Sequence, residues 1–156
     1  MRRVHFPGFS AIPALALAAL LAGGGLALAA DMSNLTFTGD ASFHGPHGGQ
    51  PIHVAVVDST THKVVAEKSG TVSKTAEPSF SFTFPGVLQA GKNYEVDYWI
   101  DSNFGGGTLG VCDAKQHDHQ WRVKLGKVTG DVFDKVVVVT HQPAKTTSVC
   151  SVFKKM

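Results

Sequence analysis

Apolar residues in this chain recur mostly at every second position, in short runs that are separated by turn residues. Ile52, Val54 and Val56 share one face of such a run, and a period of two is typical of half-buried β-strands. The polar segment 58–61 has the composition of a turn, so segment 62–66 is predicted to return as the second strand of a hairpin. Further strands are predicted near residues 35–38, 80–84, 94–100, 121–125, 135–141 and 148–153.

About seven or eight such strands, with no amphipathic helix between them, predict an all-β fold. We expect an antiparallel two-sheet sandwich, since Phe80, Phe82 and Phe84 form one apolar face that a second sheet would cover. The unbroken β-branched run from Val136 to Val139 predicts a strand that is buried on both faces or central in its sheet.

The first thirty residues have the pattern of a secretory signal peptide. Arg2 and Arg3 form a basic start, segment 12–28 is almost wholly Ala, Leu and Gly, and small residues stand at the expected cleavage site after Ala29 or Ala30. The sequence therefore predicts a cleaved signal peptide over residues 1–30 and a single β-sandwich domain over residues 31–156.

A membrane anchor is the alternative interpretation of the same segment. Pro13 and the glycines at 23–25 interrupt the apolar stretch, and no basic cluster follows it, so we favour cleavage and expect no membrane span in the mature chain. The Arg2-Arg3 pair leaves both the Sec and the twin-arginine export routes open.

Charge excludes one class of partner. Loss of Arg2 and Arg3 from the 14 basic residues leaves 12, which equals the number of acidic residues. A mature chain with zero formal charge and scattered charged residues lacks the basic surface that binds nucleic acid or an anionic membrane.

The only two cysteines, Cys112 and Cys150, both lie in the predicted mature part. An even number of cysteines in an oxidising compartment predicts one structural disulfide. A catalytic redox pair would favour a Cys-x-x-Cys spacing, which is absent. The bond would fix the long loop that contains Cys112 to the predicted last strand.

The segment 102–120 is the longest stretch without strand character, and it is rich in Gly, Asp and His. Asp101 and Asn103 have the Asp-x-Asn spacing of calcium loops, and Asp113 or Asp118 would complete an oxygen shell. An EF-hand is excluded because Gly105 and Cys112 occupy two of its ligand positions. The alternative is an Asx-turn followed by a flexible glycine-rich connection.

The segment 91–103, together with Asp113, resembles the strand and loop of bacterial exported transthyretin-like sandwich proteins. Their pattern is Gly-x-Tyr-x-Val followed by Asp-x-Asn-x-x-Gly and a later Asp. The resemblance covers about 25 residues, and the extra glycines at 105–107 depart from the pattern. It implies a transthyretin-like or immunoglobulin-like sandwich that acts as a small binding, scaffold or accessory module, and it brings no catalytic residues with it.

Histidines gather in two regions, with His44, His47 and His53 around the first long strand and His117 and His119 in the loop. Imidazoles bind zinc, copper and nickel, and an H-x-H pair on extended backbone directs both rings to one side. A site from His117, His119 and one of His44 or His47 would require two segments to meet at one end of the sandwich. Exposed or titrating histidines are the alternative.

No catalytic constellation is apparent. No nucleophile-elbow motif surrounds a serine, and Glu95, Asp97 and Asp101 are predicted to form the solvated face of one strand. Trp99 shares that face and Trp121 follows the loop, so both tryptophans are candidates for a ligand surface. Packing under a loop is the favoured alternative for Trp99.

These features predict an exported, non-catalytic binding or accessory module that presents the loop 101–121 to another exported or envelope protein. We expect a periplasmic or secreted location. A structural calcium ion is the first candidate ligand of the loop, ahead of copper or zinc. The alternative function is a periplasmic copper- or zinc-handling protein that uses the loop and N-terminal histidines. An enzymatic role ranks last, because it would need such a metal with an open coordination position.

Overall fold

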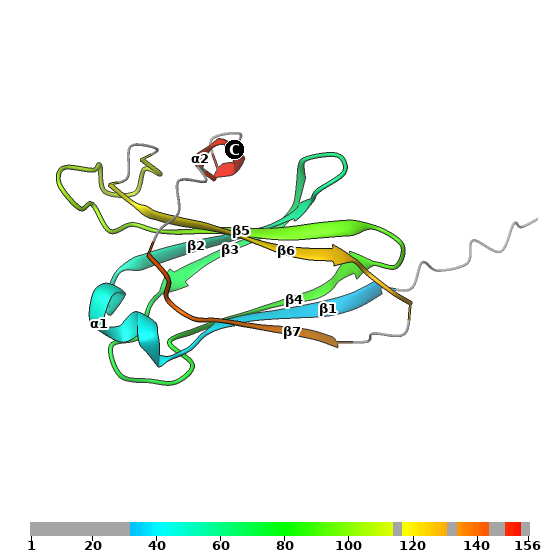
Figure 1. Cartoon of the computed structure of the whole chain (residues 1–156), viewed down its shortest axis with the longest axis horizontal. Helices are drawn as coiled ribbons and strands as arrows, with labels where there is room; N and C mark the ends of the chain where they lie inside the picture. Colours follow the sequence, from blue (N-terminus) through cyan, green and yellow to red (C-terminus); the bar gives the residue numbers. More distant parts are fainter. Residues whose placement is uncertain (1–31, 114–116, 131–133, 144–148, 154–156) are drawn as a thin grey trace, which may run out of the picture.

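The computed structural model describes residues 32–113, 117–130, 134–143 and 149–153. The predicted signal peptide lies outside the described residues. Within them the chain forms seven strands and three short helices (Figure 1). The strands are β1 (Met32–Gly39), β2 (Pro51–Asp58), β3 (Lys63–Thr71), β4 (Phe80–Gln89), β5 (Asn93–Ile100), β6 (His119–Lys127) and β7 (Asp134–Val139), and the helices are η1 (Ala41–Phe43), α1 (His44–His47) and α2 (Cys150–Phe153).

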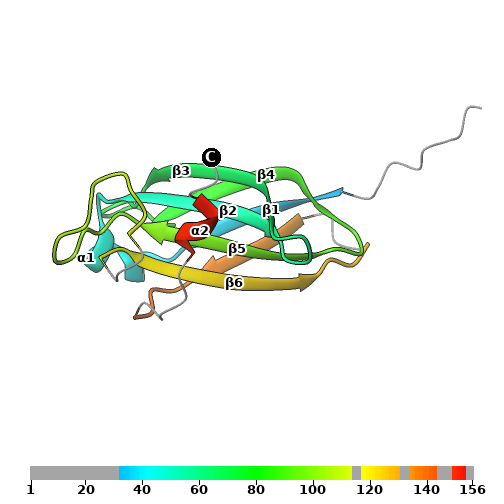
Figure 2. The same ribbon diagram turned by 90° about the horizontal axis from the view of Figure 1, so that it is seen from above.

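The strands form two sheets that lie face to face, which confirms the predicted all-β sandwich (Figures 1 and 2). One sheet has the order β4-β1-β7 and the other has the order β3-β2-β5-β6. Neighbouring strands are antiparallel except for β1 and β7, which run parallel. Strands β6 and β7 are therefore edge strands, and Figure 2 shows them along the same side of the sandwich.

The core lies between the sheets and is built from the alternating apolar positions. On β4, Phe80, Phe82 and Phe84 are buried while the residues between them are exposed. The ring of Phe37 from β1 meets that of Tyr98 from β5 at 5.1 Å between centroids, edge to face. Aromatic contacts of this kind, together with the apolar area that they bury, hold the two sheets together.

Two predictions about strands are wrong. Val136 and Val138 are each 64% exposed, because β7 is the edge of a three-stranded sheet and only Val137 and Val139 pack toward the core. The segment 150–153 is the helix α2 rather than a strand. It lies over the outer face of the four-stranded sheet (Figures 1 and 2), where it has no strand edge to pair with, so the backbone closes a local turn from Val152 to Val149.

The outer face of β5 is buried, which corrects the predicted solvated face. Glu95, Asp97 and Asp101 are all at most 6% exposed. Arg122 from β6 donates two hydrogen bonds to Asp97, at 2.7 and 2.6 Å, and lies 3.3 Å from Glu95. Buried carboxylates need such partners because the loss of hydration is otherwise costly.

The disulfide between Cys112 and Cys150 is present, as predicted. Together with Val149 and Phe153 it covers Trp99, which is 3% exposed. On its other side Trp99 stacks on His53, with the ring centroids 4.4 Å apart. The bond therefore attaches the loop after β5 and the C-terminal segment to the same face of the sheet. No helix among the described residues is long and apolar enough to cross a membrane.

Replacing both Cys112 and Cys150 by serine should lower the free energy of unfolding by about 4 kcal/mol, because the bond closes a loop of 38 residues in the unfolded chain. Urea unfolding of the variant and the native protein measures this difference. Reducing agent should lower the stability of the native protein and leave that of the variant unchanged. Equal midpoints for the variant and the oxidised native protein would contradict the expectation.

Candidate metal centre

Three chain segments that are distant in the sequence meet at one end of the sandwich, and each contributes one histidine to a cluster. His47 closes α1, His119 opens β6 and His141 follows β7. The backbone N–H of Asp40 donates a hydrogen bond to the Val139 carbonyl. This bond extends the pairing of β1 and β7 as far as the start of η1. The backbone N–H of His141 then donates to the Ser42 hydroxyl at 2.7 Å. These bonds set the segment after β7 against η1 and α1.

The three imidazoles converge on one point. Their nearest ring nitrogens all lie within 4.8 Å of one another, and His119 Nδ1 lies 2.9 Å from His47 Nε2. The ring centroid of His47 lies 4.8 Å from that of His119 and 5.1 Å from that of His141. Among the residues that the structure describes, this is the group of three or more His, Cys, Asp or Glu side chains with converging ligand atoms.

Hydrogen bonds determine which ring nitrogens are free. The Gln50 side-chain oxygen lies 2.7 Å from His47 Nδ1. An amide oxygen only accepts, so Nδ1 carries the proton and Nε2 presents its lone pair to the cluster. The turn that places Gln50 there passes through Gly49 at φ +91°, a conformation that suits glycine. His119 Nδ1 then donates to His47 Nε2 in the metal-free protein.

His141 supplies a third donor atom. Its Nε2 is buried and has no hydrogen-bond partner among the described residues. A buried polar atom without a partner is rare in folded proteins and calls for a physical explanation. A metal ion between the three rings would bond to this nitrogen and to His47 Nε2, and it would replace the proton on His119 Nδ1.

The cluster is enclosed by aromatic rings, which lowers its affinity for protons. The Trp121 ring lies 5.9, 5.6 and 6.0 Å from His47, His119 and His141 respectively, between centroids, and Phe104 lies 5.0 Å from His119. Burial lowers the pKa of His47 to about 4, with the charges of His119 and His141 adding to the effect. Burial also lowers the pKa values of His119 and His141. All three are therefore neutral at pH 7, the state that binds metal.

The distances fit a transition metal after small side-chain movements. Bonds of about 2.0–2.1 Å to imidazole nitrogen in a tetrahedral site place the nitrogens about 3.3 Å apart. The His47 and His119 nitrogens are slightly closer than this, and the longest separation in the cluster is at most 4.8 Å. Side-chain rotations that move the ring nitrogens by roughly 1 Å would bring all three to the separation that a tetrahedral metal site requires.

The structure brings together only part of the predicted histidine set. His47 and His119 meet, as a site at one end of the sandwich required. The Nε2 atom of His44 instead lies 2.8 Å from the Ala76 carbonyl oxygen, and Nδ1 of His117 lies 2.8 Å from that of Phe104. The H-x-H argument is wrong for His117, because β6 begins only at His119 and residues 117 and 118 lie in a turn.

His141 was missed by the sequence interpretation. It was assigned only to the end of a predicted strand, and a strand's own residues do not reveal which neighbour it pairs with. Its position follows from the parallel pairing of β7 with β1, since the chain after β1 leads directly into α1 and His47. A prediction that β7 pairs with β1 would have identified His141 as a neighbour of His47.

The acidic residues of the predicted calcium loop are used differently. The Asp118 carboxylate accepts backbone N–H bonds from Ser102, Asn103 and Asp113, at 3.0, 3.2 and 2.9 Å. The Asp101 carboxylate accepts from the backbone of Gly110 at 2.7 Å and from the Asn103 side chain. These bonds organise the loop, and the carboxylates of Asp101, Asp113 and Asp118 do not converge on one point. Calcium binding stays a prediction.

Of the two tryptophans proposed as a ligand surface, Trp99 is buried beneath the disulfide, as the alternative interpretation favoured. Trp121 is half-buried and lies between the histidines and a cavity at the sandwich edge. Its indole N–H donates to the Gln142 carbonyl at 3.2 Å, which fixes the ring beside His141.

No family model and no curated protein matches this chain. Among solved structures, a fimbrial assembly protein from Parabacteroides distasonis is similar over 72% of this chain, with 14% sequence identity and a TM-score of 0.36. The match covers 52% of that protein, so this chain spans about half its length.

In EDTA, the free energy of unfolding should fall as the pH is lowered from about 6.5 to about 4. The folded-state pKa of His47 lies below its ordinary value of 6.5, so the unfolded chain binds more protons in this window and stability is lost. His47 should contribute about 3 kcal/mol to the loss.

Urea unfolding at a series of pH values tests this expectation. The His47→Gln variant should have a flatter pH dependence than the native protein. His62→Asn is the matched control, because His62 is exposed at φ 54° and asparagine tolerates that conformation. The idea fails if His47→Gln leaves the slope unchanged.

Proposed function

We propose that this protein is an exported binding module whose ligand is a late first-row transition-metal ion, copper or zinc. The observation that supports it is the convergence of three neutral imidazoles, from buried His47 and half-buried His119 and His141, with one buried ring nitrogen of His141 left without a partner. The buried lone pair of His141 Nε2 costs stability unless a ligand such as a metal ion satisfies it.

The donor set supports this choice of metals. Imidazole nitrogens bind zinc, copper and nickel, whereas calcium and magnesium prefer oxygen ligands. Both thiols are in the disulfide, so no thiolate is available to add to the shell. Three protein ligands leave a fourth position for water or for a donor from a partner. This favours a site that takes up and releases its ion over a closed structural site.

Export is supported by the disulfide, which persists in oxidising compartments, and by the signal-peptide pattern of residues 1–30. Both support the proposed periplasmic or secreted location. The transthyretin-like or immunoglobulin-like relationship remains part of this proposal and rests on the sequence resemblance alone.

A second candidate function is a contact module without metal, in which the loop after β5 binds another exported or envelope protein. Phe104, Leu109 and Val111 in this loop are 47%, 77% and 46% exposed. Their backbone is fixed by the disulfide and by the Asp101 and Asp118 hydrogen bonds. A preorganised loop with exposed apolar side chains is typical of a protein-binding surface.

Metal analysis of the untagged mature protein tests the first proposal. We expect one equivalent of copper or zinc after dialysis, and a gain of about 2.7 kcal/mol in stability at an ion concentration 100 times the dissociation constant. Alanine at His47, His119 or His141 should weaken binding by more than about 100-fold, since loss of a mere outer partner costs 10–100-fold.

The matched controls are His44→Ala and His117→Ala, whose rings bond to backbone carbonyls outside the cluster. Both should bind the ion as tightly as the native protein. Calcium should leave the melting temperature unchanged if the loop carboxylates stay on their backbone partners. Sub-stoichiometric metal with no stabilisation would refute the metal proposal and favour the contact module.

Gln50 should act as a positioning residue, because its side-chain oxygen fixes the proton of His47 on Nδ1. Gln50→Leu removes this acceptor and should weaken metal binding by about 10–100-fold. Gln50→Glu retains an acceptor in the same place and should restore binding. Isothermal titration calorimetry with zinc measures both, and equal affinities for the leucine and glutamate variants would disprove the role.

A further inference from the structure

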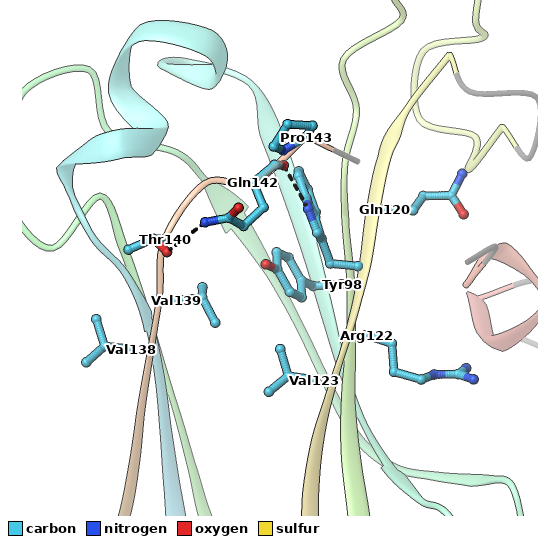
Figure 3. Close-up of a pocket in the computed structure, with 10 residues that line it drawn as sticks. Tyr98, Gln120, Arg122, Val123, Val138, Val139, Thr140, Gln142 and Pro143 are labelled. Carbon is cyan, nitrogen blue, oxygen red and sulfur yellow. Dashed lines mark hydrogen bonds between the residues drawn. The ribbon is translucent and has the colours of Figure 1, made fainter. Parts of the chain in front are cut away.

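A cavity of about 390 Å³ lies between the edge strands β6 and β7. Figure 3 shows the residues that line it. Its volume lies within the range of small-molecule sites, about 300–1,000 Å³. The apolar walls come from both sheets, with Trp121 and Val123 on β6 and Val138 and Val139 on β7.

Tyr98 forms the inner wall and supplies one unused polar group. The residue is 2% exposed and lines the cavity. Among the described residues no group hydrogen-bonds to its hydroxyl, whereas the hydroxyl of Tyr94 on the same strand accepts from the backbone of Gln89. Figure 3 shows the ring between β6 and β7 with its oxygen directed toward β7. Burial raises the pKa of Tyr98, so the phenol keeps its proton and is a hydrogen-bond donor at neutral pH.

The charged and amide groups nearest the cavity are occupied elsewhere. Arg122 lines it only with its inner part, because its guanidinium group bonds to Asp97 and Glu95 on the outer face of the sheet (Figure 3). Gln120 also turns outward, where its side chain accepts from Val149 and donates to Asp113. The interior therefore offers no free charge among its described lining residues.

Thr140 and Gln142 form the polar rim. Their side chains lie 3.5 Å apart, and the Gln142 carbonyl holds the indole N–H of Trp121. The Trp121 ring stacks on Tyr98 at 5.0 Å between centroids with the planes 16° apart. Two stacked aromatic rings, valine walls and a single donor match the usual design of a ligand pocket, which is mostly apolar with few placed polar groups.

We propose that the cavity between β6 and β7 binds a compact, uncharged, mostly apolar small molecule that carries a hydrogen-bond acceptor for the Tyr98 hydroxyl. The metal centre lies on the other side of Trp121 and shares only this ring with the cavity. None of the three histidines lines the cavity, so ligand binding can be measured in the metal-free protein.

Acetophenone and ethylbenzene are suitable probes, because they have nearly the same shape and only acetophenone has an acceptor oxygen. In EDTA, acetophenone should shift the indole N–H resonance of Trp121 in a saturable way and leave that of buried Trp99 unchanged. Tyr98→Phe should weaken acetophenone binding by about 3–10-fold, the value of one hydrogen bond, and change ethylbenzene binding by less than about 2-fold.

Val123→Phe, which places a larger side chain in the cavity, should abolish binding of both probes. If Val123→Phe impairs folding, the affinities of Tyr98→Phe for acetophenone and ethylbenzene still test the proposed hydrogen bond. Absence of saturable shifts up to the solubility limit would overturn the proposal, as would equal effects of Tyr98→Phe on both probes. Shifts confined to the outward amides of Val136 and Val138 would also overturn it, in favour of strand addition by a protein partner. None of these results bears on the metal proposal, since EDTA is present throughout.

Discussion

The packing of the Tyr98 ring between the two sheets is the contact on which the rest of the structure depends. Tyr98 meets Phe37 of the opposite sheet and stacks on Trp121 of its own sheet. Trp121 in turn contacts all three histidines. A single row of rings therefore runs from the core to the candidate metal centre and passes the cavity on the way. Loss of this packing would separate the sheets and disperse both sites.

The sequence predicted the sandwich because period two is a local property that each strand carries by itself. It also predicted that His47 and His119 were candidates, and that Cys112 and Cys150 form a disulfide. It did not identify His141, and it placed Val136–Val139 in the interior. Both errors have one cause: the position of β7 at a sheet edge, parallel to β1, is set by long-range pairing. A run of valines reads the same on an edge strand and on a central one.

The outer face of β5 shows the same limit for charged residues. Glu95, Asp97 and Asp101 alternate as a solvated face would, yet they are buried. Arg122 on the next strand pairs with Glu95 and Asp97. Gly110 of the following loop bonds to Asp101, and the segment around the disulfide covers Trp99 between them. An alternating pattern establishes which residues share a face. It does not establish whether that face meets water, because a segment fifty residues away along the chain can cover it.

Acidic and histidine residues are both abundant at the metal end of the sandwich, and hydrogen bonding separates their roles. The Asp101 and Asp118 carboxylates are saturated by the backbone amides of their own loop, which gives the loop a fixed shape. The imidazoles have fewer partners, and His141 has a buried nitrogen with none. The unpaired nitrogen of His141 is unfavourable for the metal-free chain, since an apolar side chain at the same position would pack without an orphaned nitrogen. An unpaired buried nitrogen beside two further imidazoles is the arrangement that a bound metal ion would satisfy.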